Sequence, residues 1–174
     1  MPRRSRLHIP HAHSRPGEAP DFGYLETSPA GVVARPDANA RVRDIGNLFV
    51  ELVRVLDDDH QAVGPWHPHL DPSDLQVGLR HMLLTRVFDD RMQRAQRAGK
   101  ISFYMRSLGE EAVSVAQCMA LRPRDMLFPS YRNQGLYVAR GKPLVDLMCQ
   151  LLSNTRDMCK GRQLPVMYHW AEGR

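Results

Sequence analysis

The sequence has few cysteines and no long apolar run. Its three cysteines, Cys118, Cys149 and Cys159, are widely spaced and form no CxxC pair. This excludes a dense disulfide framework and favours a reducing compartment. No stretch approaches the roughly 18 consecutive apolar residues of a transmembrane helix, so we predict no membrane span. The N-terminus, MPRRSRLHIP, has arginines but no apolar segment. A secretory signal is therefore not predicted, and a basic lead is favoured over an organelle transit peptide.

What the sequence does have is proline and positive charge. The 13 prolines are concentrated toward the N-terminal side of the 174 residues. We therefore predict an extended N-terminal arm over residues 1–70 and an ordered domain over residues 71–174. The 24 Lys and Arg exceed the 19 Asp and Glu, which gives a net charge of +5. This balance is compatible with phosphate groups, acidic partners or nucleic acid, and also with an ordinary solvated surface.

A long amphipathic helix is the clearest predicted element. Asp71 stands before Pro72, a proline at the first helical position, and Gly99 follows the last periodic residue. These are helix start and stop signals, so the helix should run from about residue 72 to 98. Its apolar side is predicted from Leu75, Leu79, Met82, Leu83, Val87, Phe88, Met92 and Ala95, and its outer side from Arg80, Arg86, Arg91, Arg94 and Arg97. The arginines are compatible with either a solvated face or a surface that binds nucleic acid.

Shorter elements are predicted on either side of this helix. Residues 42–56 have helical periodicity, with a strand over 48–56 as the alternative. Later helices are predicted from about residue 110 to Pro123, over 134–140 and over 143–152. The short apolar run 126–128 is predicted to be a strand, because Asp125 and Pro129 flank it. The fold class is therefore α/β, mostly helical with few short strands.

The loop after the predicted strand is the candidate ligand site. It reads Ser-Tyr-Arg-Asn-Gln-Gly over residues 130–135. In open α/β folds, ligands bind beyond the carboxyl ends of the strands. Tyr131 and Arg132 are the side chains that we predict to contact the ligand.

Three stretches together resemble one family. They read KISFYMRSLGEEA, DMLFPSYRNQG and LLSNTRDMCKGRQLPVMY, within residues 71–168. They resemble the α subunits of branched-chain 2-oxo acid (2-oxoisovalerate) dehydrogenases, the thiamine-diphosphate-dependent E1 components. RLHIPHAHSRPGEAPDFGYL and LVRVLDDDHQAVGPW resemble the bacterial version of that subunit. The resemblance implies that residues 71–174 are the N-terminal portion of a thiamine-diphosphate-binding fold.

The resemblance also implies which residues line the site. Tyr131 and Arg132, with Ser130 beside them, match positions that contact the cofactor's diphosphate; animal members have Gln in place of Ser130. Phe103, Tyr104 and Met105 match the substrate pocket, and the pyruvate branch usually has His at the position of Met105. An apolar wall suits a branched acyl group, because each buried CH₂ contributes about 0.8 kcal/mol.

The implied activity is oxidative decarboxylation of branched-chain 2-oxo acids, with acyl transfer to a lipoyl group on the E2 acyltransferase. The implied cofactors are thiamine diphosphate and Mg²⁺, and the implied partner is an E1 β subunit in an α2β2 assembly. No stretch matches the family's Gly-Asp-Gly motif, so we assign no metal ligand to this chain. The resemblance implies that the residue that activates the cofactor belongs to the β subunit, so we assign no catalytic residue either. We expect the N-terminal part of a longer subunit, inactive alone, in the bacterial cytoplasm rather than the mitochondrial matrix. An E1 α subunit for pyruvate or acetoin is the nearer alternative, and a basic helical nucleic-acid-binding module is the distant one.

Overall fold

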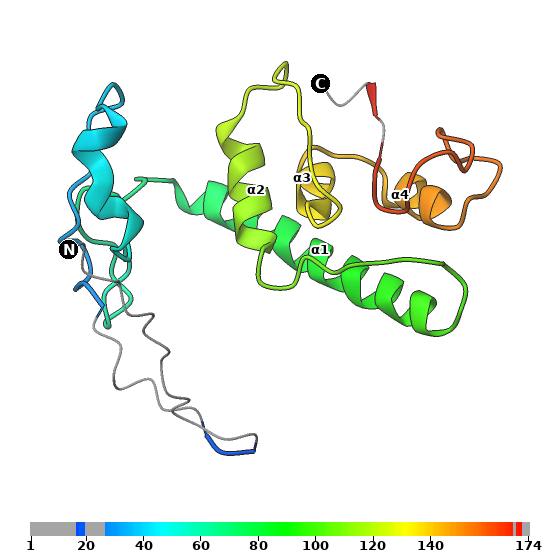
Figure 1. Ribbon diagram of the computed structural model, residues 1–174, viewed down its shortest axis with the longest axis horizontal. Helices are drawn as coiled ribbons and strands as arrows, with labels where there is room; N and C mark the ends of the chain where they lie inside the picture. Colours follow the sequence, from blue (N-terminus) through cyan, green and yellow to red (C-terminus); the bar gives the residue numbers. More distant parts are fainter. Residues whose placement is uncertain (1–16, 20–26, 169, 172–174) are drawn as a thin grey trace, which may run out of the picture. The chain divides into compact units, whose positions relative to one another are not determined.

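A computed structural model describes residues 17–19, 27–168 and 170–171 (Figure 1). The chain divides into two compact units, residues 1–69 and residues 70–174. The predicted basic lead, MPRRSRLHIP, lies outside the described residues. Within the described residues, no helix is long and apolar enough to cross a membrane.

The described part of the first unit, residues 17–19 and 27–69, has little regular structure. Its helical element η1 is a 3-10 helix, Val42–Phe49, with non-helical dihedral angles at Ile45 and no buried residue. The predicted helix over 42–56 is therefore only half present, because helices this short need a buried apolar face for stability. The alternative strand is reduced to one antiparallel bridge between Leu56 and Ala62.

The long helix is present as predicted. Helix α1 spans Pro72–Arg97, with Pro72 in its first turn. The Asp71 carbonyl accepts hydrogen bonds from the backbone N–H groups of Asp74 and Leu75. At the other end, Gly99 has a φ of 69°, a left-handed conformation that costs glycine little. Sequence signals therefore determined both ends of α1.

Three shorter helices follow α1 in the described residues of the second unit (Figure 1). They are α2 (Glu111–Ala120), α3 (Gln134–Ala139) and α4 (Leu144–Leu151). Helices α1, α2 and α3 all contact one another. Each agrees with a predicted helix to within a few residues.

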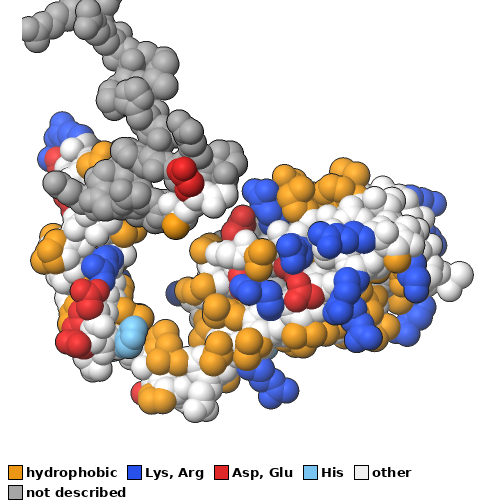
Figure 2. Space-filling view, turned by 90° about the horizontal axis from the view of Figure 1, so that it is seen from below, with side chains coloured by type: hydrophobic (Ala, Val, Ile, Leu, Met, Phe, Trp, Pro, Cys, Tyr) orange, Lys and Arg blue, Asp and Glu red, His pale blue; other side chains and the backbone are white. Residues whose placement is uncertain are grey.

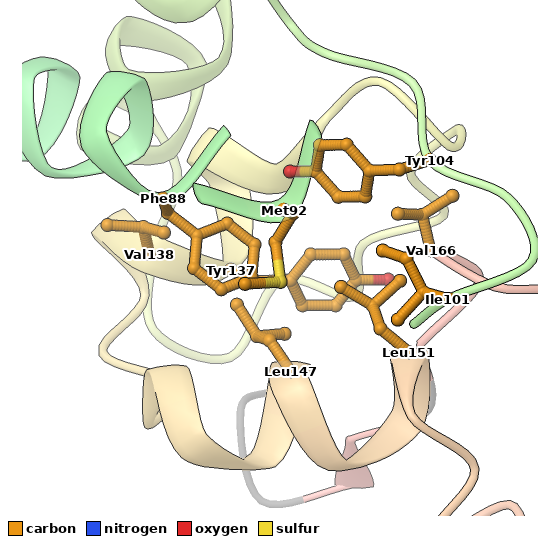
Figure 3. Packing of buried hydrophobic residues seen from close by; sticks show 9 residues of the cluster. All are labelled: Phe88, Met92, Ile101, Tyr104, Tyr137, Val138, Leu147, Leu151 and Val166. Atoms are coloured by element: carbon orange, nitrogen blue, oxygen red, sulfur yellow. The ribbon is translucent and has the colours of Figure 1, made fainter. Parts of the chain in front are cut away.

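The core of this unit lies where α1, α3 and α4 meet the segments that follow α1 and α4 (Figure 3). Its buried members are Phe88, Met92, Ile101, Tyr104, Tyr137, Val138, Leu147, Leu151 and Val166. The Tyr137 hydroxyl donates a hydrogen bond to the Tyr168 carbonyl at 3.1 Å. This bond ties the segment after α4 to α3.

The buried face of α1 agrees with the predicted one at Phe88 and Met92 and differs elsewhere. Its buried residues are Gly78, Thr85, Phe88, Asp89 and Met92. The predicted core residues Leu75, Leu79, Leu83 and Val87 are instead exposed by more than half of their surface. Periodicity alone could not separate the two faces, because leucine and valine extend around much of the helix.

The predicted strand over 126–128 is absent. Residues Met126 and Phe128 are 68% and 89% exposed, and the described residues form no β-ladder. A strand exists only through backbone hydrogen bonds to a neighbour, and no described segment pairs with this one. The structure is therefore mostly helical over its described part, and the α/β class is not seen there.

The α2–α3 contact depends on a glycine. A Cβ at Gly135 would lie 2.9 Å from the Ser114 Cβ and 3.6 Å from the Thr85 Oγ1. We expect Gly135→Ala to destabilise the unit by about 1 kcal/mol, because an overpacking cost of about 1–3 kcal/mol exceeds the gain of roughly 0.5–1 kcal/mol in helix propensity. Thermal unfolding followed by circular dichroism measures this. The control is Gly46→Ala, where an added Cβ meets nothing within 4 Å; equal melting of both variants would contradict the expectation.

Candidate functional site

The loop before α3 is ordered by its own side chains. The Ser130 N–H and Oγ both donate to the Asn133 Oδ1 at 2.8 Å. The Asn133 Nδ2 in turn donates to the Ser114 Oγ on α2 at 3.3 Å. Ser130 therefore shapes the loop, and its exposed side chain remains next to Tyr131.

Gln134 connects this loop to the segment that follows α1. It is 1% exposed. Its Nε2 donates to two carbonyl groups, those of Tyr131 at 3.0 Å and Met105 at 2.8 Å. A buried amide that donates to two backbone segments fixes their relative position, because a buried carbonyl without a hydrogen bond would cost about 1–3 kcal/mol of stability.

Four of the six predicted site residues come together here. The rings of Phe103 and Tyr131 meet edge to face, with centroids 6.2 Å apart. The Arg132 Nη1 lies 3.7 Å from the Met105 Sδ, and the Arg132 guanidinium lies 5.3 Å from the Tyr131 ring centroid. Two motifs that are 27 residues apart in sequence thus form one surface, which we call the 103–132 wall: Phe103, Met105, Tyr131 and Arg132.

Arg132 supplies the positive charge of this wall. Its Nε lies 3.2 Å from the Glu110 Oε1, and its side chain is 42% exposed. The ion pair with Glu110 is itself 47% exposed on the carboxylate side, so solvent screens it. Methionine sulfur is only a weak acceptor. The guanidinium therefore keeps donor capacity for an anion, and Tyr131, 39% exposed, stands beside it.

Tyr104 lies elsewhere. Its side chain is 3% exposed and belongs to the core, where its ring meets Phe88 edge to face (Figure 3). Its hydroxyl donates to the Asp89 Oδ1 at 2.5 Å. Burial and the neighbouring Asp89 charge raise the pKa of Tyr104 far above its usual value. The structure therefore places Tyr104 behind the 103–132 wall rather than on it.

Three buried polar residues of this region escaped the sequence analysis. Asp89, Gln134 and Ser107 are each exposed by 1% or less. The sequence gives no sign that Asp89 is buried, because Asp90 and several arginines surround it there. A buried carboxylate and an exposed one have the same sequence signal, so burial had to come from the structure.

Glu111 begins α2 as an almost fully buried carboxylate. It is 3% exposed, pairs with Arg86 of α1 and accepts the Gly109 N–H at 2.9 Å. The hydrogen bond from Arg86 lowers the pKa of Glu111 below its ordinary value. The predicted solvated Arg86 thus has a specific partner.

This lowered pKa makes a prediction about pH. A group with a depressed pKa in the folded state stabilises the protein above its ordinary pKa, and that contribution is lost as pH falls through the folded value. We therefore expect the stability gap between wild type and Glu111→Gln to be wide at pH 7 and to narrow below about pH 4. Urea unfolding midpoints at both pH values measure it. Most other carboxylates are common to both proteins and cancel, and the charge of Glu111 is only a minor cause of the raised pKa of Asp89. A constant gap would therefore contradict the expectation.

The second unit also contains a cavity with a different lining. It has a volume of about 650 Å³ and is lined by residues that include Met126, Phe128, Arg140, Met167 and Trp170. None of the predicted site residues lines it. Among residues 17–19, 27–168 and 170–171, no three His, Cys, Asp or Glu side chains gather in a way that would hold a metal ion.

Comparison with known proteins places the chain in a family. Residues 79–174 match the model of the dehydrogenase E1 component, and residues 3–42 match that of the 2-oxoisovalerate dehydrogenase E1 alpha subunit N terminal. The chain belongs to the dehydrogenase E1 component family, which confirms the resemblance inferred from its motifs.

Individual proteins that are similar to the chain have names more specific than that of the family. The chain is 55% identical over 163 residues to the 2-oxoisovalerate dehydrogenase subunit alpha of Pseudomonas aeruginosa, which covers 94% of this chain and 40% of that protein. It is 32% identical over 161 residues to the mitochondrial subunit alpha 2 of Arabidopsis thaliana, covering 92% and 33%. The mitochondrial subunit alpha of Homo sapiens is 37% identical over 120 residues, covering 68% and 27%. The chain thus spans between about a quarter and two fifths of the length of these relatives.

Proposed function

We propose that this chain is part of the α subunit of an E1 component that oxidatively decarboxylates branched-chain 2-oxo acids and passes the acyl group to a lipoyl-bearing E2. The observation that carries the proposal is the 103–132 wall, in which an apolar part from one motif meets a cationic and phenolic part from the other. Thiamine diphosphate dependence follows from membership of the family.

Tyr131 and Arg132 would hold the diphosphate, with Ser130 beside them. A guanidinium donates parallel, charge-assisted hydrogen bonds to phosphate oxygens. Arg132 fits this role because its pair with Glu110 is half-exposed and leaves other N–H donors available. The cation also lies beside the Tyr131 ring, which limits its rotamers. When bound, thiamine diphosphate supplies a nucleophilic carbon and an electron sink for the loss of CO₂.

Phe103 and Met105 would form the wall against the branched acyl group. Both are partly exposed, and both contact the cation–phenol half of the site. An aromatic edge and a thioether adapt to a branched aliphatic chain and exclude water from the carbon that reacts. Tyr104 belongs to the same proposed pocket as its support, because its ring is buried behind the two.

The remaining parts of the proposal concern partners and place. We propose Mg²⁺ at the diphosphate and assign none of its ligands to this chain. An E1 β subunit, in an α2β2 assembly, would complete the site and supply the residue that activates the cofactor. The proposed compartment is the bacterial cytoplasm, which suits the reduced cysteines Cys118, Cys149 and Cys159.

Substrate turnover tests the proposal. The assembled enzyme, with this chain as part of its α subunit, should give a higher kcat/KM for 2-oxo acids with branched side chains than for pyruvate. A preference of about tenfold or more is expected, because one or two extra methyl groups in an apolar pocket are worth roughly 1–3 kcal/mol. Equal or reversed preference would favour the alternative E1 α subunit for pyruvate or acetoin.

A salt titration tests the nucleic-acid alternative. On the face of residues 70–174 that Figure 2 shows, basic side chains are interspersed with hydrophobic and acidic ones. A continuous basic stripe would instead be expected of a phosphate-binding surface. Addition of DNA or RNA at low salt should therefore give no steeply salt-dependent binding, and a steep log–log slope would overturn this assignment.

A further inference from the structure

A buried carboxylate lies behind the 103–132 wall. Asp89 is 1% exposed, in the middle of α1. It accepts three hydrogen bonds, from the Tyr104 hydroxyl at 2.5 Å, the Ser107 N–H at 2.7 Å and the Ser107 Oγ at 2.8 Å. All three donors belong to one short segment after α1. A carboxylate that accepts three such hydrogen bonds fixes the position of that segment along α1.

The segment alternates between core and wall. Tyr104 is buried, whereas its neighbours Phe103 and Met105 are partly exposed and contact Tyr131 and Arg132. Successive side chains of an extended segment point to opposite sides. A bond that keeps Tyr104 directed inward therefore keeps both neighbours directed outward, toward the wall.

Met105 is held from two sides. Its carbonyl accepts the Gln134 Nε2 at 2.8 Å, which fixes it to the loop before α3. Asp89 holds the residue before it and the residue two positions after it. Met105 is thus fixed by two buried side chains, Asp89 and Gln134, and each of these is only 1% exposed.

We infer that Asp89 is a positioning residue: through Tyr104 and Ser107 it sets the register in which Phe103 and Met105 face the substrate's acyl chain, and so determines the preference for branched substrates. This inference rests on the proposed function. It assigns Asp89 no contact with substrate or cofactor. Asparagine should substitute for it, because its oxygen accepts from Ser107 and its amide donates to the Tyr104 oxygen.

The first test uses the 174-residue chain. Asp89→Ala should accelerate hydrogen exchange of the Ser107 amide by about tenfold or more, since the loss of a hydrogen bond to a charged acceptor has that size. Amides of α4 serve as the internal reference. Asp89→Asn should change exchange at Ser107 by less than about threefold. The matched control is Asp90→Ala, the exposed neighbour that pairs with Arg106 of the same segment at 3.2 Å, and it should leave the Ser107 amide unchanged.

The second test uses the assembled enzyme. Asp89→Ala should raise KM for branched 2-oxo acids by about tenfold with kcat little changed, and the branched-to-unbranched ratio of kcat/KM should fall accordingly. Asp89→Asn should restore the ratio, and Asp90→Ala should keep it. A loss of stability alone lowers the active fraction for all substrates equally and leaves the ratio intact. If the Ala variant does not fold, Tyr104→Phe, which removes one of the three bonds, should shift the ratio in the same direction.

The outcomes separate this inference from the proposed function. Faster exchange at Ser107 with an unchanged substrate ratio would overturn the positioning role and leave the proposed function standing. An unchanged Ser107 amide in Asp89→Ala would also overturn it. Absence of 2-oxo acid turnover by the wild-type assembly would refute the proposed function, and the inference with it, whatever the exchange result.

Discussion

Replacing Arg132 by alanine should weaken thiamine diphosphate binding by about 10- to 100-fold in the assembled enzyme. The estimate comes from hydrogen bonds to charged groups, which contribute roughly 1.5–3 kcal/mol each. Arg132 is the cation of the 103–132 wall, and its side chain is 42% exposed although its Nε is buried beside Glu110. Isothermal calorimetry with the cofactor and Mg²⁺ measures the affinity directly. The cofactor affinity of Arg132→Lys should lie between those of wild type and Arg132→Ala, because lysine keeps the positive charge but loses the planar guanidinium that donates two parallel hydrogen bonds.

The control for this experiment is Arg80→Ala. Arg80 is an exposed arginine of α1, and the described residues give it no ion pair. It carries the same charge as Arg132 but lies outside the wall. Its removal should change cofactor affinity by less than about twofold, through the long-range field alone. Unchanged affinity in Arg132→Ala, or equal losses in both variants, would refute the assignment of Arg132 to the diphosphate.

Glu110 gives a second measure of the same site. Its carboxylate lies 3.2 Å from the Arg132 Nε and would compete with a phosphate for the same cation. If Arg132 binds the diphosphate, Glu110→Gln should leave affinity unchanged or raise it modestly, since a like charge near the anion is removed. This distinguishes an anion-binding arginine from one whose role is to hold the start of α2. In the second case, Glu110→Gln and Arg132→Ala would have similar effects.

The ends of the helices and the assignment of two motifs to one site could be predicted from the sequence for different reasons. The ends of α1 followed from local chemistry, Pro72 at its start and Gly99 after its end, and these signals act without tertiary context. The 103–132 wall depends on contacts across 27 residues, which no local rule predicts. The family resemblance assigned residues of both motifs to one site, but it did not predict the contact between them. The Gln134 bridge between them had no separate signal.

Burial was the least predictable property. Leu79 and Leu83 of α1 are exposed by more than half, whereas Asp89 on the same helix is buried. Amphipathic periodicity assumes that apolar residues turn inward, and this fails where a polar group has its own partners inside. The missing strand at 126–128 is the same kind of error, since its formation depends on a neighbouring segment rather than on its own residues.

Leu147→Ala should cost the second unit about 2–5 kcal/mol of unfolding free energy. Leu147 is fully buried and belongs to the core cluster with Tyr137, Leu151 and Val166 (Figure 3). Removal of a buried leucine side chain costs its transfer free energy and leaves a cavity that the neighbours fill only in part. Urea denaturation of the 174-residue chain measures the loss. Because a domain of this size has a total stability of about 5–15 kcal/mol, this single change removes a large fraction of it.

The matched control lies five residues further on. Leu152→Ala makes the same chemical change at the C-terminal end of α4, where the side chain is 48% exposed. Its cost should stay near 0.5 kcal/mol, roughly the value for surface substitutions. A cooperative transition in wild type, lost in Leu147→Ala and kept in Leu152→Ala, would mean that the core of Figure 3 folds as a unit. Equal effects of the two substitutions would mean that α4 does not cover this core in solution, and that the buried position of Tyr104 depends on other parts of the core.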